Sequence, residues 1–348
     1  MAYTTINKST DYFNTKLFTG NGSTQSITGV GFQPDWVWYK NRSATANHGL
    51  FDAVRGATKL IQSNASGAEQ TVSGVTSFDS DGFGIGADSD GNGNGNNIVA
   101  WNWKANGQGS SNTDGSINTT YTSVNTTAGF SICKWSGTGS AGTIGHGLGA
   151  VPKMIICKNT DTSVNWIVYH NKLDASAPQD KYIELNASTG LQDYPMWNDT
   201  APTSSVFSVG SDIATNKSGS PMIAYCFAEK TGYSKFGSYT GNGNANGTFI
   251  YTGFKPAWIM IKRTDSTANW RMIDSKRNSY NILPRTLTAS QNAAEYTGTD
   301  DFGNTDILSN GFKIRTSYAE ANNSGATFIY MAFGQSIVGS NNIPATAR

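Results

Sequence analysis

Three runs of apolar residues, each ending in a lysine, dominate the hydrophobic pattern of the chain. They cover 36–40, 154–158 and 258–262, and a proline stands two residues before each run. Because consecutive positions are apolar, we expect strands that are buried on both faces, with the terminal cation capping an edge. These runs are the predicted core strands.

Shorter segments in each third of the chain alternate apolar and small or polar residues, which is typical of strands. They lie at 82–86, 206–210 and 311–315, and again within 100–103, 224–227 and 330–333. Gly-rich loops with hairpin character precede the core strands, and their Asn-Gly steps favour positive φ. The pattern contains no convincing amphipathic helix. We therefore predict an all-β protein built from antiparallel sandwiches.

One layout of chemically distinctive residues occurs three times, starting at Pro34, Pro152 and Pro256. A lysine follows six residues later, a ring fourteen residues later, and Asp or His eighteen residues later. These positions are Lys40, Lys158 and Lys262; His48, Trp166 and Trp270; and Asp52, His170 and Asp274. The prolines are 118 and 104 residues apart, which exceeds solenoid periods and matches the usual size of a domain.

The repeat predicts three tandem sandwich domains, each with its own apolar core. We place them at 1–107, 108–231 and 232–348, and call these segments copies 1, 2 and 3. Residues 106–116 offer no apolar side chain and predict a flexible linker, whereas the second joint at 229–232 is short.

Composition narrows the class of protein. Only 14% of the 348 residues are charged, the formal net charge is +1, and 39 residues are glycine. Average proteins carry about 25% charged residues, so Asn, Ser, Thr and Gly must supply solubility, as in extracellular or virion β-proteins. Dispersed Lys and Arg argue against a nucleic-acid partner, and no apolar stretch is long enough for a membrane span.

The three cysteines, Cys133, Cys157 and Cys226, all fall in copy 2. An odd number confined to one copy excludes a disulfide framework shared by the repeats. The N-terminal residues lack the pattern of a signal peptide, so we expect neither export nor an anchor, and folding in a reducing cytosol. No cofactor motif is present.

Residues 27–43, with His48, the segment Asp-Ala-Val-Arg-Gly at 52–56 and residues 77–83, resemble a repeated module of virion proteins in tailed phages, notably marine ones. Those modules are similar to lectin-like sandwiches of the concanavalin type. The likeness is strongest over 11–105 and fades in the later copies. It implies a structural part of a phage particle, such as a tail fibre, a receptor-binding protein or a capsid-surface component, located in virions assembled in the host cytoplasm.

Catalysis is not expected from the repeated acids. Asp52 and Asp274 correspond to His170, so a catalytic carboxylate would be missing from one copy in three, and a structural role as strand-end groups is favoured. Glycosidases need two paired carboxyl groups, and no glutamate stands at an equivalent position in the repeat. We predict a protein that is not an enzyme. A depolymerase stays a third option without support in the sequence.

Metal binding has one weak candidate. Asp88, Asp90 and Asn92 match the start of a calcium loop, but Val99 occupies the position that requires a bidentate Glu. A solvated hairpin is favoured instead. His48, His146 and His170 are too scattered for a zinc site.

Exposed rings offer the sharper functional hypothesis, because they can stack on sugar faces. Core packing is favoured for Trp36, Trp38, Trp103 and Trp258, whereas Tyr194 and Trp197 lie in a loop and are better exposed candidates. The complete set of hypothetical ligand-binding residues is Tyr194, Trp197, Trp166, Trp270, His48, Asp52 and Asp274.

We therefore expect a phage virion protein, with a tail fibre or another host-facing appendage as its place in the particle. Its expected partners are other virion proteins and a host surface glycan, bound by several modest sites acting together. Analogy with fibres suggests a homotrimer, for which the sequence has no stalk signature. The alternative is a capsid decoration or tail connector with a purely architectural role.

Overall fold

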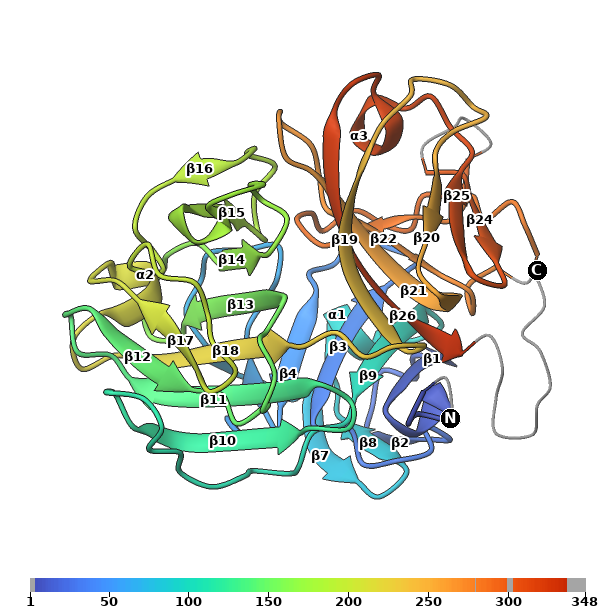
Figure 1. Cartoon of the computed structure of the whole chain (residues 1–348). Helices are drawn as coiled ribbons and strands as arrows, with labels where there is room; N and C mark the ends of the chain where they lie inside the picture. Colours follow the sequence, from blue (N-terminus) through green and yellow to red (C-terminus); the bar gives the residue numbers. More distant parts are fainter. Residues whose placement is uncertain (1–3, 279, 299–302, 337–348) are drawn as a thin grey trace.

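A computed structural model of the chain describes residues 4–278, 280–298 and 303–336. Figure 1 shows three groups of strands, coloured blue to cyan, green to yellow and orange to red, gathered side by side rather than strung out in a line. Antiparallel strands dominate, and the all-β prediction is confirmed.

The elements follow the copies along the chain. Copy 1 holds η1 (Ser9–Asp11), β1 (Phe13–Thr19), β2 (Gln25–Thr28), β3 (Trp36–Asn41), β4 (Gly49–Asp52), β5 (Lys59–Leu60), β6 (Gln70–Thr71), β7 (Val75–Asp79), β8 (Gly82–Ile85), α1 (Ser89–Asn92) and β9 (Asn97–Trp103). Copy 2 holds β10 (Thr119–Asn125), β11 (Phe130–Ser136), β12 (Gly142–Gly145), β13 (Met154–Asn159), β14 (Ile167–His170), η2 (Pro178–Asp180), β15 (Lys181–Glu184), β16 (Gln192–Asp193), β17 (Val206–Val209), α2 (Ile213–Asn216) and β18 (Pro221–Phe227). Copy 3 holds β19 (Ser234–Thr240), β20 (Phe249–Tyr251), β21 (Phe254–Arg263), β22 (Arg271–Asp274), β23 (Leu287–Thr288), β24 (Thr305–Leu308), β25 (Gly311–Ile314), α3 (Ala319–Asn322) and β26 (Thr327–Ser336).

Four strands of each main sheet share one order. They run β1-β9-β3-β4, β11-β18-β13-β14 and β19-β26-β21-β22, so the last strand of each copy lies next to its core strand, and copies 2 and 3 extend the sheet with β15-β16 and with β23. A small second sheet accompanies each main sheet, in the orders β2-β8-β7, β12-β17 and β20-β25-β24. Copy 2 alone adds β10 beside β11. This repeated order supports the triplication read from the sequence.

Both faces of the core strands are buried, as the apolar runs predicted. In β3, Val37 and Tyr39 point into the space between the two sheets of copy 1, whereas Trp36 and Trp38 point the opposite way. Strand geometry explains this alternation, because successive side chains leave opposite faces of a sheet. The same division holds in β13 and β21.

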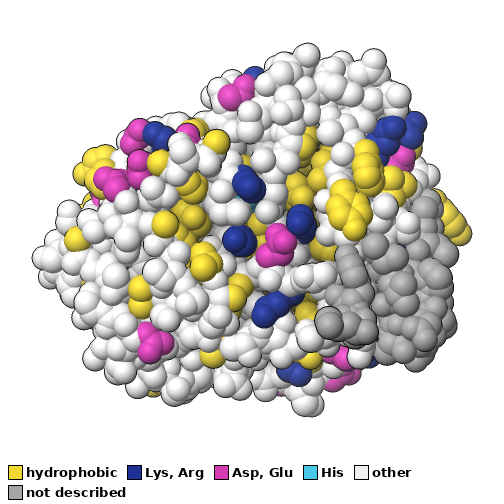
Figure 2. All heavy atoms as spheres, in the orientation of Figure 1, with side chains coloured by type: hydrophobic (Ala, Val, Ile, Leu, Met, Phe, Trp, Pro, Cys, Tyr) yellow, Lys and Arg dark blue, Asp and Glu magenta, His cyan; other side chains and the backbone are white. Residues whose placement is uncertain are grey.

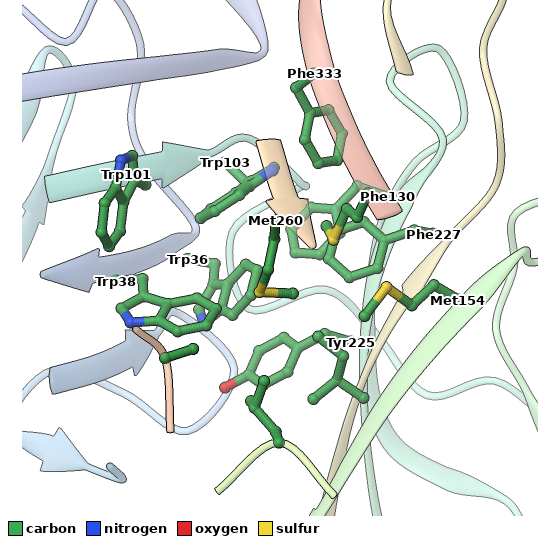
Figure 3. Close-up of a cluster of buried hydrophobic side chains, with 14 of the residues drawn as sticks. Trp36, Trp38, Trp101, Trp103, Phe130, Met154, Tyr225, Phe227, Met260 and Phe333 are labelled. Atoms are coloured by element: carbon green, nitrogen blue, oxygen red, sulfur yellow. The ribbon is translucent and has the colours of Figure 1, made fainter. Parts of the chain in front are cut away.

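The second face of each main sheet packs into one central core that all three copies share. Figure 3 shows Trp36, Trp38, Trp101 and Trp103 from copy 1 gathered with rings and methionines from copies 2 and 3. Trp36 stacks on Tyr225 with ring centroids 4.4 Å apart, and Phe13 stacks on Phe333 at 5.3 Å. Each copy therefore has a private core, as expected, but also depends on a core that no copy could bury alone.

The connection between copies 1 and 2 differs from the predicted flexible linker. Its backbone is fastened at both ends, because Gly107 N–H donates to Asp35 Oδ1 at 3.0 Å and Ser116 N–H donates to Thr143 Oγ1 at 2.8 Å, while Ser110 between them exchanges hydrogen bonds with Thr122 of β10. The polar residues of 106–116 therefore belong to a segment that is hydrogen-bonded to its neighbours rather than to a flexible linker.

Candidate functional site

The rings at the fourteenth repeat position lie at the junctions between copies, where they are buried. Trp166 donates its indole N–H to Gln62 O of copy 1 at 2.9 Å, and Trp270 donates to Glu184 O of copy 2 at 2.7 Å. His48 Nε2 lies 3.0 Å from Thr288 O of copy 3. The contacts run from copy 2 to copy 1, from copy 3 to copy 2 and from copy 1 to copy 3, so they close a cycle.

The repeated lysines close the same cycle. Lys40 Nζ bonds Asn292 O of copy 3, Lys158 Nζ bonds Ser66 O of copy 1, and Lys262 Nζ bonds Ser188 O of copy 2, at 3.1–3.3 Å. Burial lowers the pKa of each ammonium from 10.5 to about 8. The expectation that these lysines cap an exposed edge is wrong, because all three are fully buried and β3, β13 and β21 are interior strands.

Asp52 and Asp274 are also buried at junctions, and each belongs to an ion pair. Asp52 Oδ2 accepts from Arg55 Nε at 2.5 Å and from the Tyr225 hydroxyl of copy 2 at 2.7 Å. Asp274 Oδ2 accepts from Arg277 Nε at 2.5 Å and from Trp101 Nε1 of copy 1 at 3.1 Å. Neither carboxylate faces solvent, so the structure places both among the contacts that join copies.

The calcium candidates lie in and beside the short helix α1 instead of a hairpin. Asp88 caps α1 by accepting from Asp90 N at 3.0 Å, and it also accepts the Tyr39 hydroxyl. Asn92 is fully buried and serves as a hydrogen-bonding hub. No cluster of three or more metal-binding side chains occurs within residues 4–278, 280–298 and 303–336.

The hub at Asn92 recurs at Asn216 and Asn322, a repeat that the sequence analysis missed. Each buried amide donates to three oxygens, two from the Gly-rich loop before the core strand and one from the segment that precedes the helix. The available signal was spacing, because each Asn stands eleven residues before the last core ring, at Trp103, Phe227 and Phe333.

Glycine is required in the loop that each hub holds. A Cβ on Gly20 would lie 2.2 Å from Gly93 O, and Gly137 and Gly241 face the equivalent carbonyls at the same distance. Two residues later, Gly22, Gly139 and Gly243 have φ near +70°, as the Asn-Gly and related steps predicted.

Tyr194 and Trp197 lie in the same loop but differ in exposure. Tyr194 is 50% exposed, whereas Trp197 is 2% exposed and packs on Tyr169 and Phe207 in the private core of copy 2. The expectation of an exposed Trp197 is wrong, because the loop turns back and places this ring inside the copy. Only Tyr194 among the seven hypothetical ligand-binding residues has a surface-exposed ring.

A pocket of about 320 Å³ opens beside this loop, at the junction of copies 1 and 2. Met196 forms part of its wall, Ser66 comes from copy 1, and Asn165 and Glu184 come from copy 2. Asp212, the N-cap of α2, and the α2 residues Ile213 and Ala214 also line the pocket, and Ile213 is 52% exposed at the surface. The pocket thus combines apolar and hydrogen-bonding groups from both copies.

The pocket exists in copy 2 because a side chain that occupies this place in the other copies is missing. Two residues before the hub asparagine stand Asp90, Ala214 and Glu320. Asp90 accepts from Asn47 Nδ2 at 3.3 Å and Glu320 accepts from Asn269 Nδ2 at 3.2 Å. Ala214 has no carboxylate to offer.

The equivalent amide in copy 2 finds its partner elsewhere. Asn165 Nδ2 donates to Glu184 Oε1 at 2.6 Å, and Thr189 Oγ1 donates to Glu184 Oε2 at 2.9 Å. Copy 2 also carries Ile167 where copy 3 carries Arg271, whose guanidinium pairs with Glu320 at 2.6 Å. Because copy 2 has Ala214 and Ile167 at these two positions, a space remains that is lined by hydrogen-bonding groups held in place. Small-molecule sites have this arrangement.

A second unusual surface lies on the small sheet of copy 3. Phe249 and Tyr251 on β20 are 46% and 55% exposed, and they share the outward face with Gly311 of β25. The equivalent positions are Ser26 and Thr28 in copy 1 and Thr143 and Gly145 in copy 2, where Gly145 is buried. Only copy 3 thus carries exposed rings at these positions.

The three cysteines of copy 2 are free and buried, and burial raises the pKa of the Cys157 and Cys226 thiols. These shifts hold them as protonated thiols, which are poor nucleophiles. The described part of the chain contains no helix long and apolar enough to cross a bilayer.

These features define a class: an all-β protein in which three equivalent units surround a shared aromatic core and open pockets lie at the junction of copies 1 and 2 and at the junction of copies 1 and 3. The chain belongs to the family described as a domain of unknown function, DUF7483, whose model matches residues 8–336 as a single unit. One model across all three copies agrees with the shared core. No curated protein and no solved structure matches the chain.

Proposed function

We propose that this protein is a structural component of a tailed-phage particle, placed on a host-facing appendage, where it adheres to surface glycans. Each copy then acts as a lectin-like sandwich of the concanavalin type within one fused body. A surface poor in charge and rich in small polar groups supports this proposal, and Figure 2 shows charged side chains scattered thinly over one face.

The observation that carries the proposal is the pocket at the junction of copies 1 and 2. Carboxylate, amide and hydroxyl groups line it together with Ile213 and Met196, so a sugar would find partners for both its hydroxyls and its C–H face. Tyr194 belongs to the same loop as Met196, and Met196 N–H bonds Tyr194 O at 2.6 Å. The exposed Tyr194 ring supplies a stacking surface near the site.

The pocket supports one principal site per chain rather than three. The positions equivalent to Ala214 carry Asp90 and Glu320, which hydrogen-bond across the corresponding space. Adhesion would then gain strength from several chains in one particle, for instance as a trimer, because linked sites raise avidity without new contacts.

Filling the pocket tests the proposal. The full chain and the variant Ala214→Gln are applied to a glycan array and to host cells, with Ala319→Gln as control because Ala319 is exposed on α3, away from the pocket. We expect wild type and Ala319→Gln to bind alike and Ala214→Gln to lose at least about tenfold in affinity. Equal binding by all three proteins, or binding by none, would contradict the proposal.

The architectural alternative, a capsid decoration or a tail connector, is favoured by one specific observation. Phe249 and Tyr251 form an exposed apolar surface that only copy 3 carries, and such patches often mark contacts with other proteins. For this role, the double variant Phe249→Ser/Tyr251→Thr, which copies the residues of copy 1, would abolish docking to particles that lack the protein. Glycan binding would be unaffected.

A further inference from the structure

The charge of the pocket limits the ligands that it can hold. Glu184 and Asp212 both line it, and no lysine or arginine is among its lining residues. The neighbouring Lys158 is not a lining residue. Its ammonium donates to the carbonyls of Ser66, Asn159 and Thr162 at 2.7–3.2 Å, and although Ser66 lies on the pocket wall, the carboxylate with which Lys158 interacts electrostatically is that of Asp161. The described lining therefore presents negative charge without a compensating cation.

The equivalent places in copies 1 and 3 show that this imbalance is specific to copy 2. Glu320 pairs with Arg271 in copy 3, and Lys40 lies close enough to Asp90 in copy 1 to interact with it electrostatically. In copy 2 the position of Arg271 is taken by Ile167, which is apolar and buried. Neutral isoleucine leaves the two carboxylates of the pocket without such a partner.

Hydrogen bonding points in the same direction. Each Glu184 oxygen already accepts one bond from the protein, from Asn165 or from Thr189, and a carboxylate oxygen can accept a second. Asp212 Oδ1 accepts from Ala214 N at 2.7 Å and so caps α2. Ionised carboxylates only accept, so the ligand must donate.

We infer that the pocket binds an uncharged or amino-bearing sugar, whose hydroxyl or ammonium groups donate to Glu184 and Asp212, and that it discriminates against acidic sugars. This inference rests on the proposed glycan adhesion and specifies its substrate class. Ile213 and Met196 receive the C–H face of the sugar, while the carboxylates repel a uronate or sialate.

The test compares matched oligosaccharides that differ only in a hydroxymethyl or a carboxylate at the same carbon. Affinities for the full chain are measured by calorimetry at neutral pH, at low and at high salt. We expect the neutral ligand to bind at least about tenfold more tightly, and salt to narrow that ratio by screening the repulsion. A carboxylate ligand that binds equally well or better overturns the inference.

Two charge-removing variants test whether Glu184 and Asp212 cause the discrimination between neutral and acidic ligands. Glu184→Gln keeps an acceptor for Asn165, and Asp212→Asn keeps a good helix cap. Each variant should reduce the ratio of neutral to acidic affinity, and an unchanged ratio in both overturns the assignment to these residues. If the acidic ligand binds wild type well and Ala214→Gln abolishes that binding, glycan adhesion at this pocket stands and only the charge argument is rejected. If neither the neutral nor the acidic ligand binds, both the adhesion proposal and the charge argument are rejected.

Discussion

Copy 2 departs from copies 1 and 3 at the junction position that follows the buried ring. Asp52 and Asp274 each pair with an arginine three residues later and accept a donor from the adjoining copy, whereas copy 2 has His170 and Leu173. The reason lies across the junction. Copies 2 and 1 present the Tyr225 hydroxyl and the Trp101 N–H, but copy 3 presents Met331 at that place.

An acid at position 170 would therefore find no side-chain donor on Met331. His170 instead bonds Tyr330 O through Nε2 at 3.1 Å and accepts Lys172 N–H at Nδ1. The lesson is that a hydrogen bond across the junction is kept in all three copies because the residues on both sides differ together: Asp faces a side-chain donor, whereas His170 faces a backbone carbonyl. At the pocket, by contrast, Ala214 has no substitute for the side chains of Asp90 and Glu320, and open space remains.

The largest effect on stability is expected from removing one of the two buried aspartates at the junctions. Asp52→Ala removes the buried carboxylate partner of Arg55, which keeps only the partly exposed Glu69 at 3.1 Å, and it removes the acceptor of the Tyr225 hydroxyl. Removing one partner of a buried pair costs about 3–5 kcal/mol. Chemical denaturation should show this loss, while Asp79→Ala, on an exposed residue, should change stability by less than about 0.5 kcal/mol. Similar small losses in both variants would contradict the role of the junction.

The next largest effect is expected from lowering the pH, which destabilises the junction that contains His170. Burial lowers the pKa of His170 from 6.5 to about 4, and the pKa values of His48 and His146 are lowered for the same reason. At these histidines the unfolded chain binds more protons between pH 4 and 6.5, so the stability that they contribute is full above pH 6.5 and falls as the pH decreases towards 4. For His170 alone the loss is roughly 3 kcal/mol.

The variant His170→Gln checks this assignment, because Gln can donate to Tyr330 O without titrating. Its unfolding free energy, measured from pH 7 to 4, should fall less steeply than that of wild type. The remaining slope comes from His48, His146 and carboxylates whose pKa is lowered in the folded chain, such as Asp81 and Asp174. Parallel profiles for the two proteins would count against His170 as a titrating group.

The smallest effect on stability is expected at the pocket. Ala214 is only 5% exposed but borders the open pocket, into which the longer Gln side chain can extend, so we expect a change of about 1 kcal/mol or less. Thermal unfolding compared with Ala319→Gln measures it. A loss of several kcal/mol would show that the place is packed rather than open.

The sequence was sufficient for the elements that depend on local pattern. The apolar runs gave β3 and β13 within one residue, and the third run lies within β21, which begins earlier and carries Pro256 at a register shift. Triplication was also readable, because residues that hold junctions recur at fixed spacing. Helices α1, α2 and α3 were missed, since four residues are too few to show a period.

The shared core was not predictable from the same pattern. A strand that is apolar on both faces can be covered by its own copy or by another one, and alternation alone does not separate these cases. Trp166 and His48 were read as ligand candidates for a related reason, because a recurring ring has the same spacing in a junction and in a binding site. Trp270 is such a residue, and it lies buried against Glu184 O.

The pocket was hidden from sequence reasoning because it is defined by an absence. Ala214 is an unremarkable residue until it is aligned with Asp90 and Glu320, and that alignment depends on the buried asparagine hub two residues later. Phe249 and Tyr251 were missed in the same way, since only comparison with Ser26 and Thr28 shows that they are unusual.

The cyclic contacts of the lysines and rings have a consequence for how this architecture changes over time. In an open array, end units carry caps, and a unit can be gained or lost at modest cost. Here every copy has two neighbours, so deleting one would strip apolar surface from both survivors at once. Copy number is therefore locked at three, and change can proceed only by specialising individual copies, as copies 2 and 3 have done at their surfaces.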